Sequence, residues 1–109
     1  MILILEKKAT DEEISKAAKD LDGYVKFVVD IEQRRVALGG SRHVDGEQLL
    51  LKDGSQQEDL WGGGLDLETS EIDFDSMINV RPKQDNPSRE VLSKEIRDII
   101  EDIVRKILK

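Results

Sequence analysis

The chain has 109 residues, no cysteine and a formal net charge of −7. This length fits one domain, residues 1–109, that folds without covalent staples. The lack of cysteine excludes disulfides, thiol catalysis and Cys-ligated metal sites. Duplex nucleic acid requires a basic surface, so the acidic balance predicts no nucleic-acid partner. Charged residues make up 38% of the chain, as in the Lys- and Glu-rich surfaces of thermophile proteins.

The apolar run from Met1 to Leu5 indicates a short buried strand. It is too short for the core of a signal peptide or for a membrane span. We therefore expect a cytoplasmic protein without a membrane partner.

Thr10-Asp11-Glu12-Glu13 has the pattern of a capping box. In this motif the Thr10 side chain accepts from the Glu13 amide, and the Glu13 side chain accepts from the Thr10 amide. Apolar residues then recur at helical spacing as far as Leu21, and Gly23 follows. The pattern predicts a first helix that ends at this glycine.

Residues 24–31 are rich in β-branched and aromatic side chains and predict a strand. Val25, Phe27, Val29 and Ile31 share one face and Val28 lies on the other, so part of this strand is expected to be covered on both sides. Residues 35–38 resume the strand pattern after a few residues, and a hairpin is the simplest connection.

Residues 41–71 give no clear element. The run Leu49-Leu50-Leu51 fits a buried strand or one turn of helix equally well. Trp61, the only tryptophan, precedes three consecutive glycines, residues 62–64. The glycines suggest a flexible segment that lets backbone pass close by. Trp61 then either anchors a loop on the core or stacks on a ligand.

Residues 72–81 alternate between apolar and polar side chains and predict a long strand that Pro82 ends. Asp73, Asp75, Asn79 and Arg81 would share its outward face. Asn86-Pro87 then marks a turn. Ser93 can cap a last helix with a broad apolar stripe. One helix near each end and strands between them predict an α+β fold with an antiparallel or mixed sheet.

Several polar residues are candidates for a ligand site. His43 and Asp45 would share a face on extended backbone and bind a common ligand, although a loop histidine tied by a turn-forming aspartate is the simpler explanation. Asp73 and Asp75 would bind a hard cation if other oxygens converged on them, although a solvated strand face in an acidic protein also explains them. Arg81 and Arg89 bracket one loop and would form an anion clamp, with Ser88 supplying a hydroxyl. Helix-entry chemistry explains the Asn86 to Arg89 segment as readily.

The blocks "VVDIE", "ALGGSRHVD", "LLLKDGSQQEDLWG", "FDSMINVRP" and "NPSR", in this order, resemble a family of small uncharacterised prokaryotic proteins classed as a domain of unknown function. The resemblance runs from about Tyr24 to the end of the chain. It implies only that these blocks belong together, since the family supplies no activity. Gly64 and Pro87 each stand where relatives carry a polar residue.

No phosphate loop, dinucleotide fingerprint or catalytic triad is present, so whether the protein is an enzyme stays open. The first hypothesis is a domain that binds a small anion in a polar pocket. Its candidate residues are His43, Asp45, Ser55, Trp61, Asp75, Asn79, Arg81, Ser88 and Arg89. The alternative is a structural or interaction protein that acts as a homodimer or assembly subunit. A metal-dependent hydrolase ranks third, and we expect no metal and no cofactor, because one histidine and scattered acids make a weak site.

Overall fold

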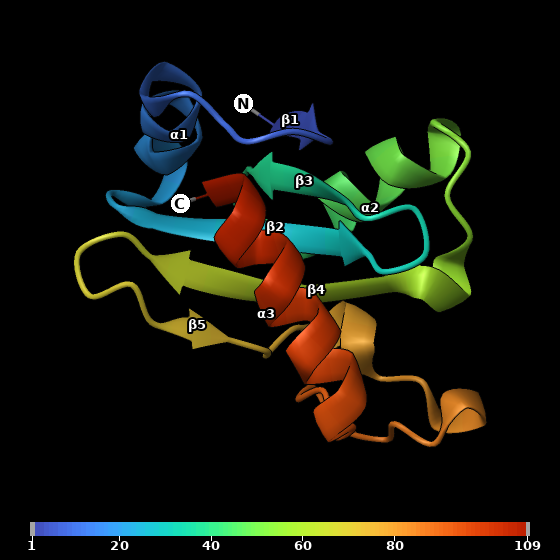
Figure 1. Cartoon of the computed structure of the whole chain (residues 1–109). Helices are drawn as coiled ribbons and strands as arrows, with labels where there is room; N and C mark the ends of the chain where they lie inside the picture. The colour runs from blue at the N-terminus through green and yellow to red at the C-terminus, as the bar shows by residue number, and fades with distance from the viewer. Residues whose placement is uncertain (1, 109) are drawn as a thin grey trace.

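The computed structural model describes residues 2–108, which form an α+β fold (Figure 1). The predicted strand at the start of the chain is β1, Ile2–Leu5, while Met1 lies outside the described residues. The other strands are β2 (Tyr24–Asp30), β3 (Arg35–Gly39), β4 (Leu60–Asp66) and β5 (Ile72–Asp73). The helices are α1 (Asp11–Ala18), α2 (His43–Lys52) and α3 (Lys94–Leu108), and short 3-10 turns include η3 (Met77–Asn79) and η4 (Pro82–Gln84).

All five strands lie in one sheet in the order β1-β3-β2-β4-β5, and every pairing is antiparallel. The predicted hairpin is confirmed: β2 pairs with β3 across a four-residue turn, with Asp30 opposite Arg35. β2 also pairs along its whole length with β4. β1 is an edge strand whose first three residues are only partly buried, so the expectation of a fully buried strand was wrong there.

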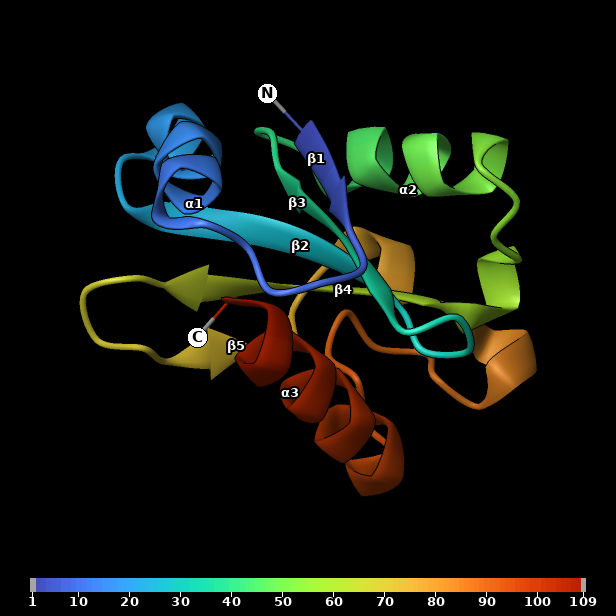
Figure 2. The same ribbon diagram turned by 45° about the horizontal axis from the view of Figure 1, so that its top comes forward.

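Helices cover both faces of the sheet (Figure 2). α1 and α3 pack on one face over the larger core, which includes Val25, Phe27, Val29 and Trp61. α2 packs on the other face over a smaller core that contains Val28. The two-sided burial of β2 is therefore confirmed. Within residues 2–108, none of the helices combines the length and the apolar character needed to cross a bilayer.

The first helix carries the capping box that its sequence predicts. The Thr10 hydroxyl accepts from the Glu13 amide, and the Glu13 carboxylate accepts from the Thr10 amide. The α-helix is shorter than predicted, because it ends at Ala18 and a 3-10 turn continues to Leu21. Gly23, at φ +92°, then turns the chain into β2.

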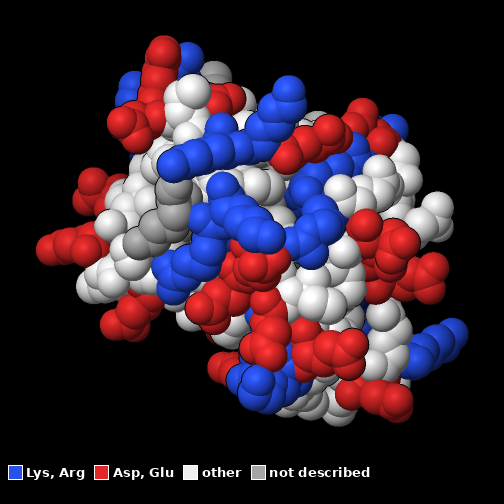
Figure 3. Space-filling model, in the orientation of Figure 1, with Lys and Arg blue, Asp and Glu red and all other residues white. Residues whose placement is uncertain are grey.

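The last helix matches its prediction closely. The Ser93 hydroxyl accepts from the Ile96 amide at the start of α3. Its apolar stripe faces the sheet, and Ile100 and Ile103 are at most 2% exposed. Acidic and basic side chains share the α3 face of the molecule (Figure 3), where Asp102 pairs with both Arg34 and Lys106.

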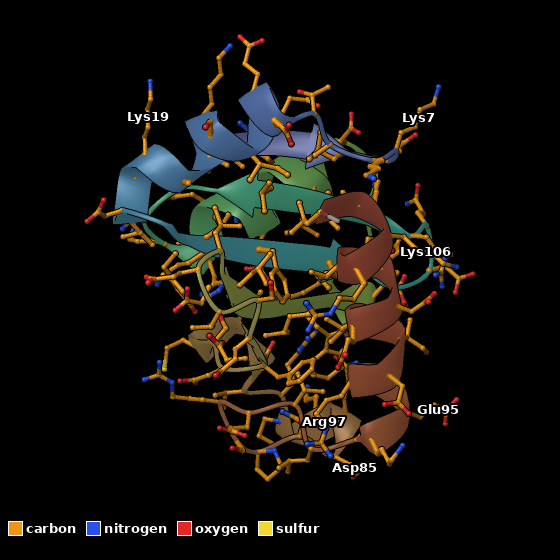
Figure 4. The ribbon with its side chains drawn as sticks, turned by 60° about the vertical axis from the view of Figure 1, so that its left-hand side comes forward. Lys7, Lys19, Asp85, Glu95, Arg97 and Lys106 are labelled. Atoms are coloured by element: carbon orange, nitrogen blue, oxygen red, sulfur yellow. The ribbon has the colours of Figure 1, made fainter. Side chains whose placement is uncertain are left out.

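Charged side chains reach into solvent from several parts of the chain. Lys7, Lys19 and Glu95 point away from the protein (Figure 4). All three are exposed, as most charged side chains are in folded proteins.

The middle of the chain contains two elements that its sequence left undefined. The run Leu49 to Leu51 is helical and belongs to α2, where Leu50 is fully buried. Gly62, Gly63 and Gly64 lie inside β4 and are all buried. The expectation of a flexible glycine segment was therefore wrong: these glycines are central sheet residues paired with β2.

The prediction of a long strand over residues 72–81 was also wrong. β5 stops at Asp73, a single bridge joins Asp75 to Glu90, and η3 begins at Met77. Asn79 was expected on the outward face but is fully buried. Its side chain pairs with Gly62 as a neighbouring strand would, accepting from the amide (2.8 Å) and donating to the carbonyl (2.9 Å).

Candidate functional site

A hollow of about 410 Å³ opens on the α2 face of the sheet, between the start of α2 and η3. Polar side chains reach it from the sheet, from the start of α2 and from the loops after β5. The polar residues that line it are Tyr24, Lys26, Arg42, His43, Asp73, Asp75, Ser76 and Arg89. Val44, Met77 and Ile78 supply the apolar part of the lining.

Two glycines of β4 make room for these side chains. The strand alternation points the Cα hydrogens of Gly62 and Gly64 toward the α2 face, opposite Val28 and Lys26 of β2. A Cβ at Gly62 would lie 2.8 Å from Ser76 and 3.1 Å from the His43 ring. One at Gly64 would lie 1.8 Å from the Tyr24 hydroxyl oxygen. The glycines are thus required for close approach across the sheet surface.

His43, the only histidine, is held by the backbone of β4. Its Nε2 lies 2.7 Å from the Gly63 carbonyl oxygen, and since a carbonyl only accepts, Nε2 carries the proton and donates. Burial, reinforced by the nearby Lys26 charge, holds the pKa of His43 below its ordinary value, against the opposing effects of the Gly63 hydrogen bond and of Asp73 and Asp75. The neutral ring therefore leaves Nδ1 as an acceptor, and among residues 2–108 the hydrogen bond of the His43 ring is the one made by Nε2.

Tyr24 and Asp73 form one side of the hollow. The Tyr24 hydroxyl donates to the Asp73 carboxylate at 2.5 Å. Burial first, and then the hydrogen bond and charge of Asp73, raise the pKa of Tyr24 well above its ordinary value. Asp73 also accepts from the Asp75 amide (3.1 Å). Because both of its oxygens are engaged, Asp73 serves to fix the Tyr24 ring across the Gly64 backbone.

The cations of the hollow differ in their partners. Arg89 pairs with Asp75 (3.0 Å) and Arg42 with Asp45 (3.1 Å), and all four side chains are more than a third exposed. Such exposed pairs contribute only about 0–1 kcal/mol, so little stability is lost when one of them breaks. Lys26 has no ion pair within the described residues, although it lies close enough to His43 to influence its pKa. Among residues 2–108, Lys26 is therefore the one cation of the lining that forms no ion pair.

Of the nine residues predicted for a site, His43, Asp75 and Arg89 line the hollow. The expectation that His43 and Asp45 share a face on extended backbone was wrong, because both lie in the first turn of α2. Residues two apart on a helix point in different directions, and Asp45 turns to Arg42 instead.

Arg81 and Trp61 form a separate arrangement. Trp61 is 1% exposed and belongs to the larger core, as expected for an anchor. The Arg81 guanidinium lies 3.9 Å from the centre of the Trp61 ring and donates to the Gln57 and Leu60 carbonyls. Arg81 therefore does not reach the hollow that Arg89 lines, and the two arginines do not meet there.

The remaining predicted residues hold loops. Ser55 is buried, donates to Asp30 (2.6 Å) and accepts from Arg35 (2.8 Å). The Ser88 hydroxyl accepts from the Glu90 amide. Asn79, besides its pairing with Gly62, donates to the Phe74 and Arg89 carbonyls (both 3.0 Å). The Asn79 and Ser88 hydrogen bonds fix the segment that forms one wall of the hollow. The Ser55 hydrogen bonds instead tie the loop after α2 to the β2–β3 hairpin.

Sequence reasoning missed Tyr24 and Lys26 as site residues. They alternate with Val25 and Phe27 along β2, so the strand period already places them on the opposite face from the larger core. What the sequence did not reveal is that the glycines of β4 lie beside them in the sheet. Within residues 2–108, no group of three or more His, Asp or Glu side chains is arranged to hold a metal ion.

The comparisons with known proteins concern the whole fold just described. Neither the curated proteins nor the solved structures gave a match. A family model described as "Protein of unknown function (DUF5674)" matches residues 3–107, which begin within β1 and end in the last turn of α3. The match includes the first strand and helix as well as the blocks after Tyr24. The chain therefore belongs to this family of proteins of unknown function.

Proposed function

We propose that the protein binds a small anion in the hollow between α2 and η3. The observation that carries this proposal is Lys26, a cation that lines the hollow and has no ion pair within the described residues. Arg42 and Arg89 lie in the same lining and are held only by exposed ion pairs. An incoming anion would neutralise Lys26 and recruit either arginine.

His43 would orient the bound anion rather than add charge. Its ring is fixed through Nε2 by the Gly63 carbonyl, so Nδ1 offers a hydrogen-bond acceptor at a fixed position. A ligand with a hydroxyl or amine next to its anionic group would donate to this nitrogen. The same nitrogen would accept a proton if the ligand underwent a reaction, which is the simplest route to an enzymatic role.

A thermal-denaturation screen with phosphate, sulfate and small carboxylates at constant ionic strength tests the proposal. A ligand that favours the native state raises the melting temperature by mass action. Lys26→Gln should abolish the rise, while Lys83→Gln should preserve it. Lys83 is an exposed lysine outside the hollow, so the two variants have the same net charge. No Lys26-dependent rise with any of these anions would refute the proposal.

A second candidate function is self-association through β1. This strand pairs only with β3 in the described part of the chain, and Ile2, Leu3 and Ile4 are partly exposed. An open edge of this kind is a template for another strand. Antiparallel pairing of two β1 edges would form a continuous sheet across a twofold axis. Sedimentation at micromolar concentration should then give the mass of two chains, and a monomer at every concentration would contradict it.

A further inference from the structure

We infer that the ligand of the hollow is a small amphipathic monocarboxylate, with one negative charge and an apolar tail. This inference rests on the proposed anion site and specifies its ligand. It starts from the two kinds of side chain in the lining. Lys26, Arg42 and Arg89 are cationic, whereas Val44, Met77 and Ile78 are apolar.

Two of these three apolar side chains are exposed, while Ile78 packs partly on the smaller core. Among the described residues, five large apolar side chains are classed as exposed, and two of them, Val44 (40%) and Met77 (65%), line this hollow. Met77 is the most exposed of the five. Apolar surface beside a polar site is typical of a ligand-binding region. A methionine is also flexible enough to fold over ligands of different shape.

The charges favour a single negative charge on the ligand. Lys26 is the one cation of the lining without an ion pair within residues 2–108, while Arg42 and Arg89 already have acidic partners. Asp73 and Asp75 add negative charge to the same lining. A dianion such as phosphate would meet their repulsion, whereas a monoanion balances Lys26 alone.

The size of the hollow agrees with an organic ligand. About 410 Å³ falls within the range of about 300–1,000 Å³ for small-molecule sites. A compact inorganic anion would leave the Val44 and Met77 side of this space without a contact. A carboxylate bound at Lys26 would instead extend its tail toward those side chains.

The test measures affinity along the series acetate, butyrate, hexanoate and octanoate by isothermal titration calorimetry, with phosphate as the compact anion. Each further buried methylene should tighten binding about threefold to fourfold. Met77→Ser should flatten this dependence on chain length. Leu92→Ser should leave it unchanged, because Leu92 is 53% exposed but lies outside the hollow. Lys26→Gln should weaken the binding of every member of the series.

The outcomes separate this inference from the proposed function. If phosphate and acetate bind as tightly as octanoate, and all depend on Lys26, the anion site stands and the amphipathic ligand is refuted. If no anion binds in a Lys26-dependent manner, both fall. If long-chain acids bind equally well to the Met77→Ser and Leu92→Ser variants, their tails lie elsewhere and the inference is again overturned.

Discussion

Gly64→Ala should collapse the Tyr24 side of the hollow, because the three atoms nearest to a Cβ at this position all belong to Tyr24. They are the hydroxyl oxygen at 1.8 Å, Cζ at 2.2 Å and Cε1 at 2.8 Å. No such contact is tolerated, so the ring must rotate away and give up its 2.5 Å hydrogen bond to Asp73. Overpacking costs about 1–3 kcal/mol, and a lost hydrogen bond to a charged acceptor costs about 1.5–3 kcal/mol.

Replacing a glycine by alanine recovers about 0.4–1 kcal/mol of unfolded-state entropy. The net loss of unfolding free energy should therefore be about 2–5 kcal/mol. A double-mutant cycle in urea isolates the cause. In the Tyr24→Ala background the clashing atoms are gone, so Gly64→Ala should cost less by about 2 kcal/mol or more.

Tyr24 is also the only tyrosine in the chain, so an absorbance titration of tyrosinate reports on this residue alone. In the wild type the pKa of Tyr24 is raised by burial and by Asp73. In Gly64→Ala it should move back toward its ordinary value of about 10. The described packing of Tyr24 on Gly64 would be refuted by two results together. The free-energy losses of Gly64→Ala and Tyr24→Ala would be additive in the double mutant, and the pKa of Tyr24 would be the same in Gly64→Ala as in the wild type.

Other predictions follow from single groups. Asn79→Asp keeps an acceptor for the Gly62 amide but turns a carboxylate toward carbonyl oxygens, so it should cost more than about 3 kcal/mol in urea unfolding. The folded-state pKa of His43 lies below 6.5, so the unfolded chain takes up this proton first as the pH falls. The stability of the wild type relative to His43→Gln should therefore decrease from about pH 7 to pH 5, and a constant difference would contradict the burial of the ring. Ile100→Ala, in the fully buried stripe of α3, should cost about 2–5 kcal/mol, and a loss below 1 kcal/mol in urea melts would show that the helix is peripheral.

The parts of the fold that were predictable depend on local periodicity. Val25, Phe27 and Val29 recur at every second position of β2, and the apolar stripe of α3 recurs at helical spacing. Each pattern lies within one element, so the sequence carries it without knowledge of the partners. The Thr10 to Glu13 capping box is local in the same sense.

The parts that were missed depend on contacts between distant segments. α2 contains Gly46 in its interior, which argues against a helix by propensity. In the structure Gly46 faces the sheet, where an added Cβ would lie 3.2 Å from Val28 and 3.3 Å from Ala37, so the glycine lets the helix pack closely. The alternation of residues 72–81 suggested a strand because Asn79 resembles an outward-facing polar residue. The Asn79 side chain is instead buried and bonds the Gly62 amide and carbonyl, as the backbone of a neighbouring strand would.

The site was predictable only in part for the same reason. His43, Asp75 and Arg89 were candidates because of their residue types, and the fold brings all three to one hollow. Lys26 was not a candidate, because its place beside Gly64 in the sheet depends on a strand register that the sequence did not specify.

The most direct test of the anion site uses the single histidine as a probe. The ring signals of His43 in a proton–carbon NMR spectrum belong to one residue and report on the interior of the hollow. Titration with hexanoate should shift these signals saturably in the wild type and in Lys83→Gln, and should leave them in place in Lys26→Gln. A binding isotherm measured by calorimetry without any shift of the His43 signals would place the ligand elsewhere and contradict the account.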